Sequence, residues 1–192
     1  IAKDREFARK LASYMPDFEI YLQFDSFKKE VLEELRGEDL RAIRLKALEH
    51  LNEFNLSTTL VVVLQKSLND DEIGKILDFA LKQKCVRGVT FQPTQYAGRN
   101  DNPHSKVDKM TLTEVRRKIL EQSTIFIKED LIPVPCNPDA LCMAYALKIE
   151  TEENGQEVIP MTRFVNPEDL LNNSRNTIVY EHDDKIKDHL LT

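Results

Sequence analysis

The sequence predicts an α/β fold built from parallel βα units. Three short apolar stretches, at 20–26, 59–65 and 88–94, have the composition of buried strands, and segments with helical periodicity separate them. Strands that alternate with helices in this way predict right-handed βαβ crossovers and therefore a parallel sheet. Three such strands are too few to close a barrel by themselves.

Composition limits the class of protein. The 192 residues are 41% hydrophobic, enough for one sizeable core. A net charge of -6, with 31% charged residues, argues against a nucleic-acid-binding surface. No apolar run approaches the roughly 20 residues that span a bilayer, and no signal peptide is visible. Three cysteines in such an acidic chain indicate a reducing, cytoplasmic setting.

The first segment, IAKDREFARK, has no initiating methionine and starts inside an expected helix, so we expect a fragment of a longer protein. A helix over 3–14 would place Phe7, Leu11 and Tyr14 on one buried stripe, and Pro16 would end it.

The first strand, IYLQFDS, has two faces. The apolar face is expected to meet the helices, and the other face would look inward in a barrel. The apolar face carries Ile20, Leu22 and Phe24, and the second carries Tyr21, Gln23 and Asp25.

Two helices are expected next: a short charged one over 28–36, closed by Gly37, and a longer one over 38–54. The longer helix has an apolar stripe formed by Leu40, Ile43, Ala47, Leu51 and Phe54.

The second strand, TLVVVLQ, is apolar on both faces, as parallel strands covered on both sides are. Asn69, with Glu72 three residues later, predicts a capping box that starts the following helix. The third strand, 86–92, ends at Pro93, and a long polar loop leads to a helix capped by Thr111 and Glu114.

The helix–strand pattern stops near residue 130. Beyond it, a proline-punctuated loop precedes an apolar segment, MAYALKIE, and an Asn-Gly pair at 153–156 predicts a hairpin turn. We therefore expect an α/β region over 1–130 and a small irregular or β extension over 131–192.

Polar side chains gather where the three strands end. Parallel strands of βα units collect their binding groups at the carboxyl ends, and amides and carboxylates there can bind ribose hydroxyls, an adenine edge or an amino acid head group. Alternatively, polar residues accumulate there because strands end in wet loops. The candidate residues are Gln23, Asp25, Gln65, Asn69, Gln92 and Thr94.

Asp25 is the sharpest single candidate, because a carboxylate after an apolar strand can accept bidentately from a diol. Its other interpretation is an N-cap for the next helix. Gly98 and Arg99 lie in the loop after the third strand. They could bind a carboxylate or phosphate, or they could simply belong to a surface loop.

Cys136 and Cys142 lie in a proline-rich region and are separated by five residues. Zinc and iron–sulfur ligands are usually closer in sequence, and two thiolates cannot fill a four-ligand site. The alternatives are a shared metal site and two loosely buried thiols.

Four stretches together resemble a known family: LQFDS (22–26), LNDDEIGKILDFA (68–80), RGVTFQPTQYAGR (87–99) and PVPC (133–136). In this order they are similar to the C-terminal half of radical S-adenosylmethionine (SAM) superfamily proteins. The nearest subgroup resembles tetraether lipid synthase, and proteins like molybdenum-cofactor-biosynthesis A are more distant.

The resemblance implies half of a partial TIM-type barrel, in which the three strands are the fourth, fifth and sixth. It places Gln23 and Asp25 near the ribose of SAM, with Gln65 to Asn69 at the fifth strand end and Gln92 to Thr94 near the adenine. Cys136 then corresponds to an auxiliary iron–sulfur ligand, with Cys142 as a weaker candidate.

The sequence departs from the family by lacking CxxxCxxC, the motif that holds the [4Fe-4S] cluster cleaving SAM to a radical, and a clear GxIxGxxE. The resemblance therefore implies a fragment that is catalytically incompetent alone and needs the N-terminal half of the barrel. The longer parent protein would bind SAM, a [4Fe-4S] cluster and a small-molecule or lipid-type substrate. An open sheet edge predicts self-association of the fragment. The alternative is a non-catalytic α/β binding or scaffold domain.

Overall fold

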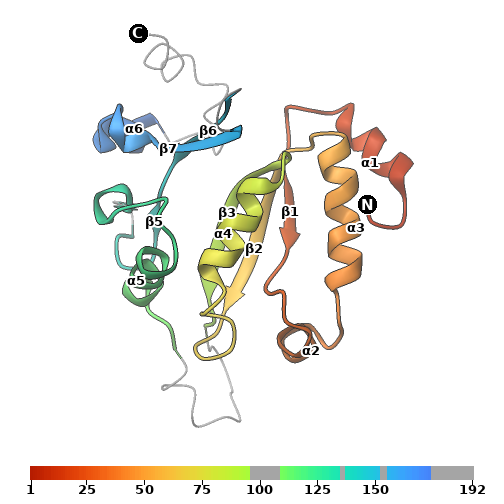
Figure 1. Cartoon of the computed structure of the whole chain (residues 1–192), viewed down its shortest axis with the longest axis horizontal. Helices are drawn as coiled ribbons and strands as arrows, with labels where there is room; N and C mark the ends of the chain where they lie inside the picture. Colours follow the sequence, from red (N-terminus) through yellow and green to blue (C-terminus); the bar gives the residue numbers. More distant parts are fainter. Residues whose placement is uncertain (96–108, 135–136, 152–154, 174–192) are drawn as a thin grey trace. The chain divides into compact units, whose positions relative to one another are not determined.

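The computed structural model describes residues 1–95, 109–134, 137–151 and 155–173, and it forms two compact units, 1–123 and 124–192. Figure 1 shows the elements of both units, which are treated separately below. The first unit contains α1 (Arg5–Ala12), β1 (Ile20–Gln23), α2 (Lys29–Arg36), α3 (Arg41–Glu53), β2 (Thr58–Leu64), α4 (Ile73–Lys82), β3 (Val86–Pro93) and α5 (Leu112–Gln122).

The sheet of the first unit is parallel, with strand order β1-β2-β3. Consecutive strands are therefore neighbours, each reached through helices, as βα units require. This confirms the predicted α/β class with a parallel sheet. β1 is shorter than predicted and ends at Gln23, because the chain turns sharply at Asp25, which has a φ of 60°.

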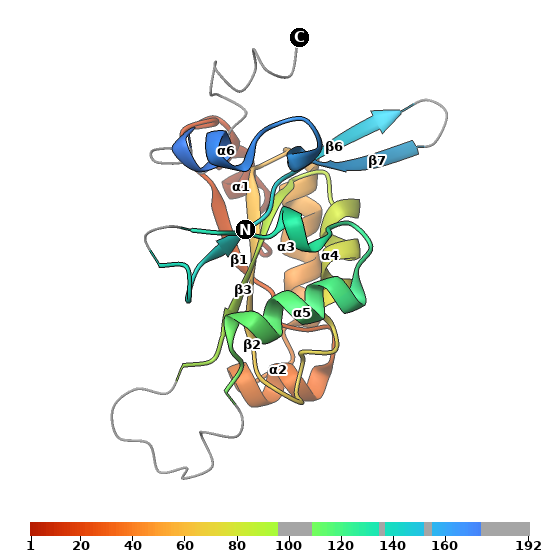
Figure 2. The same cartoon turned by 90° about the vertical axis from the view of Figure 1, so that its left-hand side faces the viewer.

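Helices α3 and α4 cover one face of this sheet, as Figures 1 and 2 show. Side chains alternate along a strand, so every second residue of β2 points into that layer. The fully buried core side chains include Leu48, Leu51, Leu60, Val62, Leu64, Ile73 and Ile76.

Two predicted helix stripes are wrong in part. In α1 the buried residue is Ala8, whereas Phe7 is 47% and Tyr14 56% exposed. In α3, Ala47 and Leu51 are buried as predicted, but Ile43 is 40% exposed, and the buried face passes through Arg44 instead. Apolar periodicity misplaced this stripe because a buried arginine does not register as an apolar position.

Helix ends were predicted with mixed success. Gly37 closes α2 in the left-handed region at φ 81°, as expected. Thr111 and Glu114 form the predicted capping box of α5. The capping box at Asn69 is wrong, because α4 begins only at Ile73 and Asn69 lies inside the preceding loop.

The second unit is mostly β structure. It contains η2 (Lys128–Asp130), β4 (Ile132–Pro133), β5 (Cys142–Met143), β6 (Ala146–Thr151), β7 (Gly155–Pro160), η3 (Met161–Arg163) and α6 (Pro167–Asn173). β6 and β7 pair antiparallel as the predicted hairpin, although 152–154 of its turn lie outside the described residues.

A buried carboxylate organises this unit. Asp130 is fully buried, caps the backbone N–H of Ile127 at 2.7 Å and binds Thr162 and Arg163, so it ties η2 to η3. A small core lies beside them, formed by Ile132, Met161, Val165 and Leu170.

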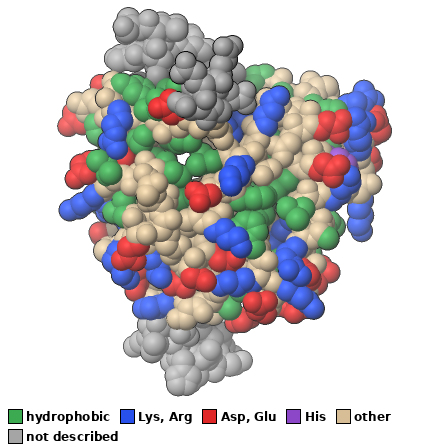
Figure 3. All heavy atoms as spheres, in the orientation of Figure 1, with side chains coloured by type: hydrophobic (Ala, Val, Ile, Leu, Met, Phe, Trp, Pro, Cys, Tyr) green, Lys and Arg blue, Asp and Glu red, His purple; other side chains and the backbone are tan. Residues whose placement is uncertain are grey.

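Charges of both signs are interspersed on the face drawn in Figure 3. Several form surface ion pairs, such as Lys46 with Glu49 and Arg117 with Glu121. None of the helices in the described ranges combines the length and the apolar character needed to cross a membrane.

Candidate functional site at the carboxyl edge of the sheet

The register of the parallel sheet brings the three strand ends to one edge. Gln23 of β1 lies opposite Val61 of β2, and Gln92 of β3 lies opposite Val63. Val61 and Val63 are two residues apart, so both glutamines lie on the same face of the sheet, the one opposite the α3–α4 layer. Thr94 follows at the end of β3, and its backbone N–H donates to the carbonyl of Leu64 at 2.8 Å.

Asp25 is the centre of the hydrogen bonding at this edge, and it is fully buried. Its carboxylate accepts from the guanidinium of Arg36 at 2.8 and 3.1 Å and from Arg44 at 3.0 Å. It also accepts from the backbone N–H of Val63 at 3.0 Å and from Nε2 of Gln23 at 2.7 Å. The carboxylate therefore joins β1, β2, α2 and α3.

The N-cap interpretation of Asp25 is wrong, since the residue before α2 is Lys28, which has no side-chain cap. The diol interpretation meets a geometric obstacle. A carboxylate has about four lone-pair sites, and those of Asp25 already accept from Arg36, Arg44 and the groups named above.

The electrostatics of the cluster favour the ionised carboxylate. Burial raises the pKa of Asp25, but hydrogen bonds from Arg36, Val63 and Gln23 outweigh it and leave the pKa below its ordinary value. The hydrogen bond to Asp25 raises the pKa of Arg36. Burial is the dominant effect on Arg44 and lowers its pKa.

The backbone at Asp25 is also unusual. Its φ of 60° lies in the left-handed region, and the N–H of Ser26 donates to the carbonyl of Phe24 at 2.8 Å, which closes a three-residue turn. Such turns with positive φ are rare and strained. Arg44 stabilises this turn by donating to the same carbonyl of Phe24 at 2.6 Å.

Asn69 connects this turn to the end of β2. Its amide nitrogen donates to the carbonyl of Asp25 at 3.0 Å and to that of Val63 at 2.7 Å. Its amide oxygen accepts from the N–H of Gln65 at 2.9 Å. Asn69 is fully buried, and all three of these hydrogen bonds are to backbone groups. Its side chain therefore supports the backbone.

Gln65, Gln92 and Thr94 are more accessible. Gln65 and Thr94 are half-buried and Gln92 is exposed. Thr94 Oγ1 donates to the carbonyl of Leu64 at 3.0 Å and keeps its lone pairs for a further partner. Within the described part of the chain, the side-chain amides of Gln65 and Gln92 make no hydrogen bond.

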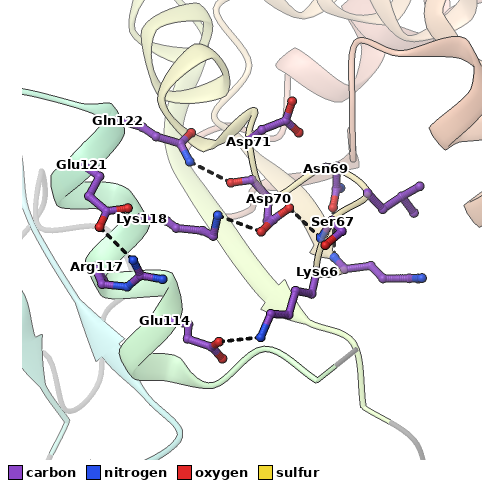
Figure 4. A network of polar contacts seen from close by, with 12 residues as sticks. Lys66, Ser67, Asn69, Asp70, Asp71, Glu114, Arg117, Lys118, Glu121 and Gln122 are labelled. Carbon is purple, nitrogen blue, oxygen red and sulfur yellow. Dashed lines mark hydrogen bonds and ion pairs between the residues drawn. The ribbon is translucent and has the colours of Figure 1, made fainter. Parts of the chain in front are cut away.

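The loop between β2 and α4 is held by α5, as Figure 4 shows. Lys66 pairs with Glu114 at 3.0 Å, and Lys118 pairs with Asp70 at 2.8 Å. Gln122 donates to the carbonyl of Asp70 at 2.7 Å. This loop carries Gln65 and Asn69, so α5 fixes the position of one strand end.

The opposite side of the same loop is tied to the segment after β1. Ser26 donates to the buried carboxylate of Glu72, and Lys28 pairs with Asp71 at 2.7 Å. The first two strand ends are thus cross-linked through polar side chains as well as through the sheet.

Sequence reasoning missed the supporting residues Arg36, Arg44 and Glu72. Arg36 and Arg44 are 11 and 19 residues from Asp25 along the chain, in helices whose other charges lie in solvent. No local motif distinguishes them. The one available signal was Arg44, a charge at a position that helical spacing from Ala47, Leu48 and Leu51 places on the buried face.

The pairing of the two candidate metal ligands, Cys136 and Cys142, stays a prediction. Cys85 is fully buried in the core, Cys142 is half-buried in β5, and Cys136 lies outside the described residues. Gly98 and Arg99 lie outside them as well. Across the ranges that the structure covers, no group of three or more His, Cys, Asp or Glu residues is arranged to hold a metal ion.

Comparison with known proteins identifies a distant relative. The chain is 29% identical, over 173 aligned residues, to a protein of Methanocaldococcus jannaschii named 7,8-dihydro-6-hydroxymethylpterin dimethyltransferase. The alignment covers 79% of this chain and 34% of the relative, so the chain spans about a third of the length of the curated relative it matches. No family model matches the chain.

Proposed function

We propose that this chain is the C-terminal half of the barrel of a radical SAM enzyme, and that the carboxyl ends of β1, β2 and β3 contribute to its SAM site. The proposal is supported chiefly by the shared face of Gln23 and Gln92 at the carboxyl edge of a parallel sheet. This is the position where βα folds bind their ligands. The similarity to a named dimethyltransferase adds independent support.

The residues at this edge suit SAM by their chemistry. Amide and hydroxyl groups of Gln23, Gln65, Gln92 and Thr94 can donate to and accept from hydroxyl, amino and carboxylate groups. Asp25 and Asn69 instead stabilise the backbone at the carboxyl edge, since their polar atoms form hydrogen bonds with protein groups. When bound, SAM would supply a 5′-deoxyadenosyl group or a methyl group to the reaction of the parent enzyme.

The described residues do not fit an iron–sulfur cluster. Cys85 is enclosed in the core beside α4, and no set of candidate ligands is assembled elsewhere in the described ranges. We therefore assign the radical-generating cluster to the part of the parent protein outside this chain, and we assign no step of the reaction to the cysteines of this chain.

The relative's name suggests the reaction class of the parent. That name describes a dimethyltransferase of 7,8-dihydro-6-hydroxymethylpterin. We infer that the parent of this chain transfers methyl groups to a small organic acceptor. Incubation of the full-length protein with methyl-labelled SAM and candidate pterins, followed by mass spectrometry, should give a labelled product.

The deciding experiment uses the full-length gene product. After anaerobic reconstitution we expect protein-bound iron and sulfide, the optical spectrum of a [4Fe-4S] cluster, and 5′-deoxyadenosine formed from SAM. Reconstituted protein that contains neither iron nor sulfide would contradict the proposal.

A second candidate is a non-catalytic α/β binding or scaffold domain. The observation that favours it is the complete engagement of Asp25 and Asn69 with protein groups, which is typical of structural polar residues. This candidate predicts that the full-length protein binds no cluster and that substituting Gln23 or Gln92 changes no ligand affinity.

A further inference from the structure

The orientation of one glutamine at the carboxyl edge is determined by its neighbours. Nε2 of Gln23 donates to Oδ1 of Asp25 at 2.7 Å and to the carbonyl of Val61 at 3.3 Å. A carboxylate oxygen and a carbonyl oxygen are acceptors only. The reversed amide would bring its own oxygen against both of them, so the network permits only the orientation with Nε2 inward.

This orientation defines what Gln23 can offer to a ligand. Both N–H groups of its amide are used within the protein, and among the described residues its Oε1 accepts no hydrogen bond. The side chain is half-buried at the end of β1. Gln23 therefore presents an acceptor, and a ligand group that meets it must donate.

Asp25 keeps the Gln23 amide in this orientation, with Nε2 inward and Oε1 toward the ligand. It is inaccessible to solvent, its two oxygens accept from Arg36, Arg44 and Val63 as well as from Gln23, and its backbone is held in a strained turn. Strain of this kind persists where the surrounding structure over-determines it, and it is concentrated at functional sites.

We propose that Asp25 is a positioning residue that acts through Gln23: buried Asp25, held by Arg36 and Arg44, fixes the Gln23 amide so that Oε1 accepts from a hydroxyl or amino group of the bound ligand. This inference rests on the proposed function, because it takes SAM as the ligand of this edge. It assigns to Asp25 no contact with the ligand.

The variant Asp25→Asn isolates this role. Asparagine tolerates positive φ, so the turn is retained. Its amide oxygen can take the place of Oδ2, which accepts from both Arg36 and Arg44, and its NH₂ group then takes the place of Oδ1 and faces Nε2 of Gln23. Two donors cannot bond, so the Gln23 amide rotates and presents N–H groups where the acceptor was.

The test is a double-mutant cycle on the full-length protein, with SAM affinity measured by titration calorimetry after anaerobic reconstitution. Gln23→Leu and Asp25→Asn should each raise the dissociation constant about tenfold, and the double variant should be no weaker than Gln23→Leu alone. If Asp25 were only structural, its effect would persist in the Gln23→Leu background, and about a hundredfold loss in the double variant would overturn the inference.

A second variant covers the case in which Asp25→Asn does not fold. Arg36→Lys keeps the positive charge but loses the two-point contact with Asp25. It should weaken SAM binding less than Asp25→Asn, and this effect should also vanish in the Gln23→Leu background. An effect of equal size in both backgrounds contradicts the inference.

The matched control is Asp39→Asn. Asp39 also pairs with an arginine, Arg41, but it lies on the surface between α2 and α3. Its substitution should leave SAM affinity unchanged. Wild-type protein that takes up no cluster and binds no SAM overturns the proposed function and this inference together, whereas normal wild-type binding with an additive cycle overturns this inference alone.

Discussion

Asn69 shows how much of the edge depends on single side chains. It is fully buried and bonds to backbone groups of Asp25, Val63 and Gln65. A buried polar group left unsatisfied costs about 1–3 kcal/mol, which makes this asparagine a principal support of the strand ends.

Asn69→Ala should lower the free energy of unfolding by about 2–3 kcal/mol, because it leaves two carbonyls and one N–H without their partner. Urea denaturation followed by circular dichroism measures this. The comparison is Asn52→Ala, which removes contacts with Gln83 and Cys85 at a half-buried position and should cost less. Equal losses for both variants would refute the special role of Asn69.

Glu114 gives a pH-dependent contribution at the start of α5. The backbone N–H of Thr111 and the ammonium group of Lys66 lower the pKa of Glu114 from 4.5 to about 2. A carboxyl whose pKa is lower in the folded state stabilises the protein above its unfolded pKa. The contribution is therefore present above pH 4.5 and is lost as the pH falls toward 2.

Glu114→Gln should be less stable than wild type at pH 6, by no more than about 1 kcal/mol because the group is partly exposed. The difference should shrink between pH 4.5 and pH 2, which urea titrations at several pH values can follow. Lys66→Met should retain most of the pH dependence, since the hydrogen bond from Thr111 is the larger cause. A difference that stays constant down to pH 2 would contradict this assignment.

At the scale of elements, α4 and α5 approach closely at Gly74. A Cβ atom at Gly74 would lie 2.1 Å from the carbonyl oxygen of Gln122, and the N–H of Gly74 donates to Oε1 of Gln122 at 3.1 Å. The position of α5 determines whether Lys118 can pair with Asp70 in the β2–α4 loop. The close approach is thus part of what fixes the strand end.

Gly74→Ala should destabilise the protein by about 1–3 kcal/mol, although alanine favours helices, because α5 must move away. Thermal unfolding of the variant measures the loss. Gly37→Ala provides the contrast: its Cβ would meet nothing within 4 Å, so its cost comes only from the positive φ. Gly37→Asn should recover part of that cost, whereas Gly74→Asn should be worse than Gly74→Ala.

At the scale of the whole chain, the open side of the sheet is its main feature. In the described residues β1 pairs with β2 alone, and Tyr21 on β1 is 57% exposed. An unpaired edge strand offers N–H and carbonyl groups to another chain. We expect the parent protein to cover this edge with its N-terminal half and the isolated chain to cover it by self-association.

Solution scattering on the isolated chain should therefore show dimers or larger species. Tyr21→Lys, which places a charge on the edge strand, should shift the population toward monomer. Tyr14→Lys is the matched control, since Tyr14 is 56% exposed but lies outside the strand, and it should leave the association unchanged. A monodisperse wild-type monomer would contradict the expectation.

The sequence by itself determined the parts of this protein that depend on neighbours in the chain. The apolar run of β2, the capping box at Thr111, the closure of α2 at Gly37 and the β6–β7 hairpin all follow from local patterns. The alternation of helices and strands determined the parallel sheet, and with it the edge that carries both Gln23 and Gln92.

Only the tertiary structure decided how the polar residues of that edge are used. Whether Asp25 caps a helix, binds a ligand or pairs with arginines depends on where α2 and α3 place Arg36 and Arg44, which lie 11 and 19 residues away. Periodicity can show that Arg44 lies on an apolar face, but the distant partner that neutralises a buried charge has no local signature. The turn at Asp25 and the role of Asn69 have the same origin, because contacts distant in sequence hold them.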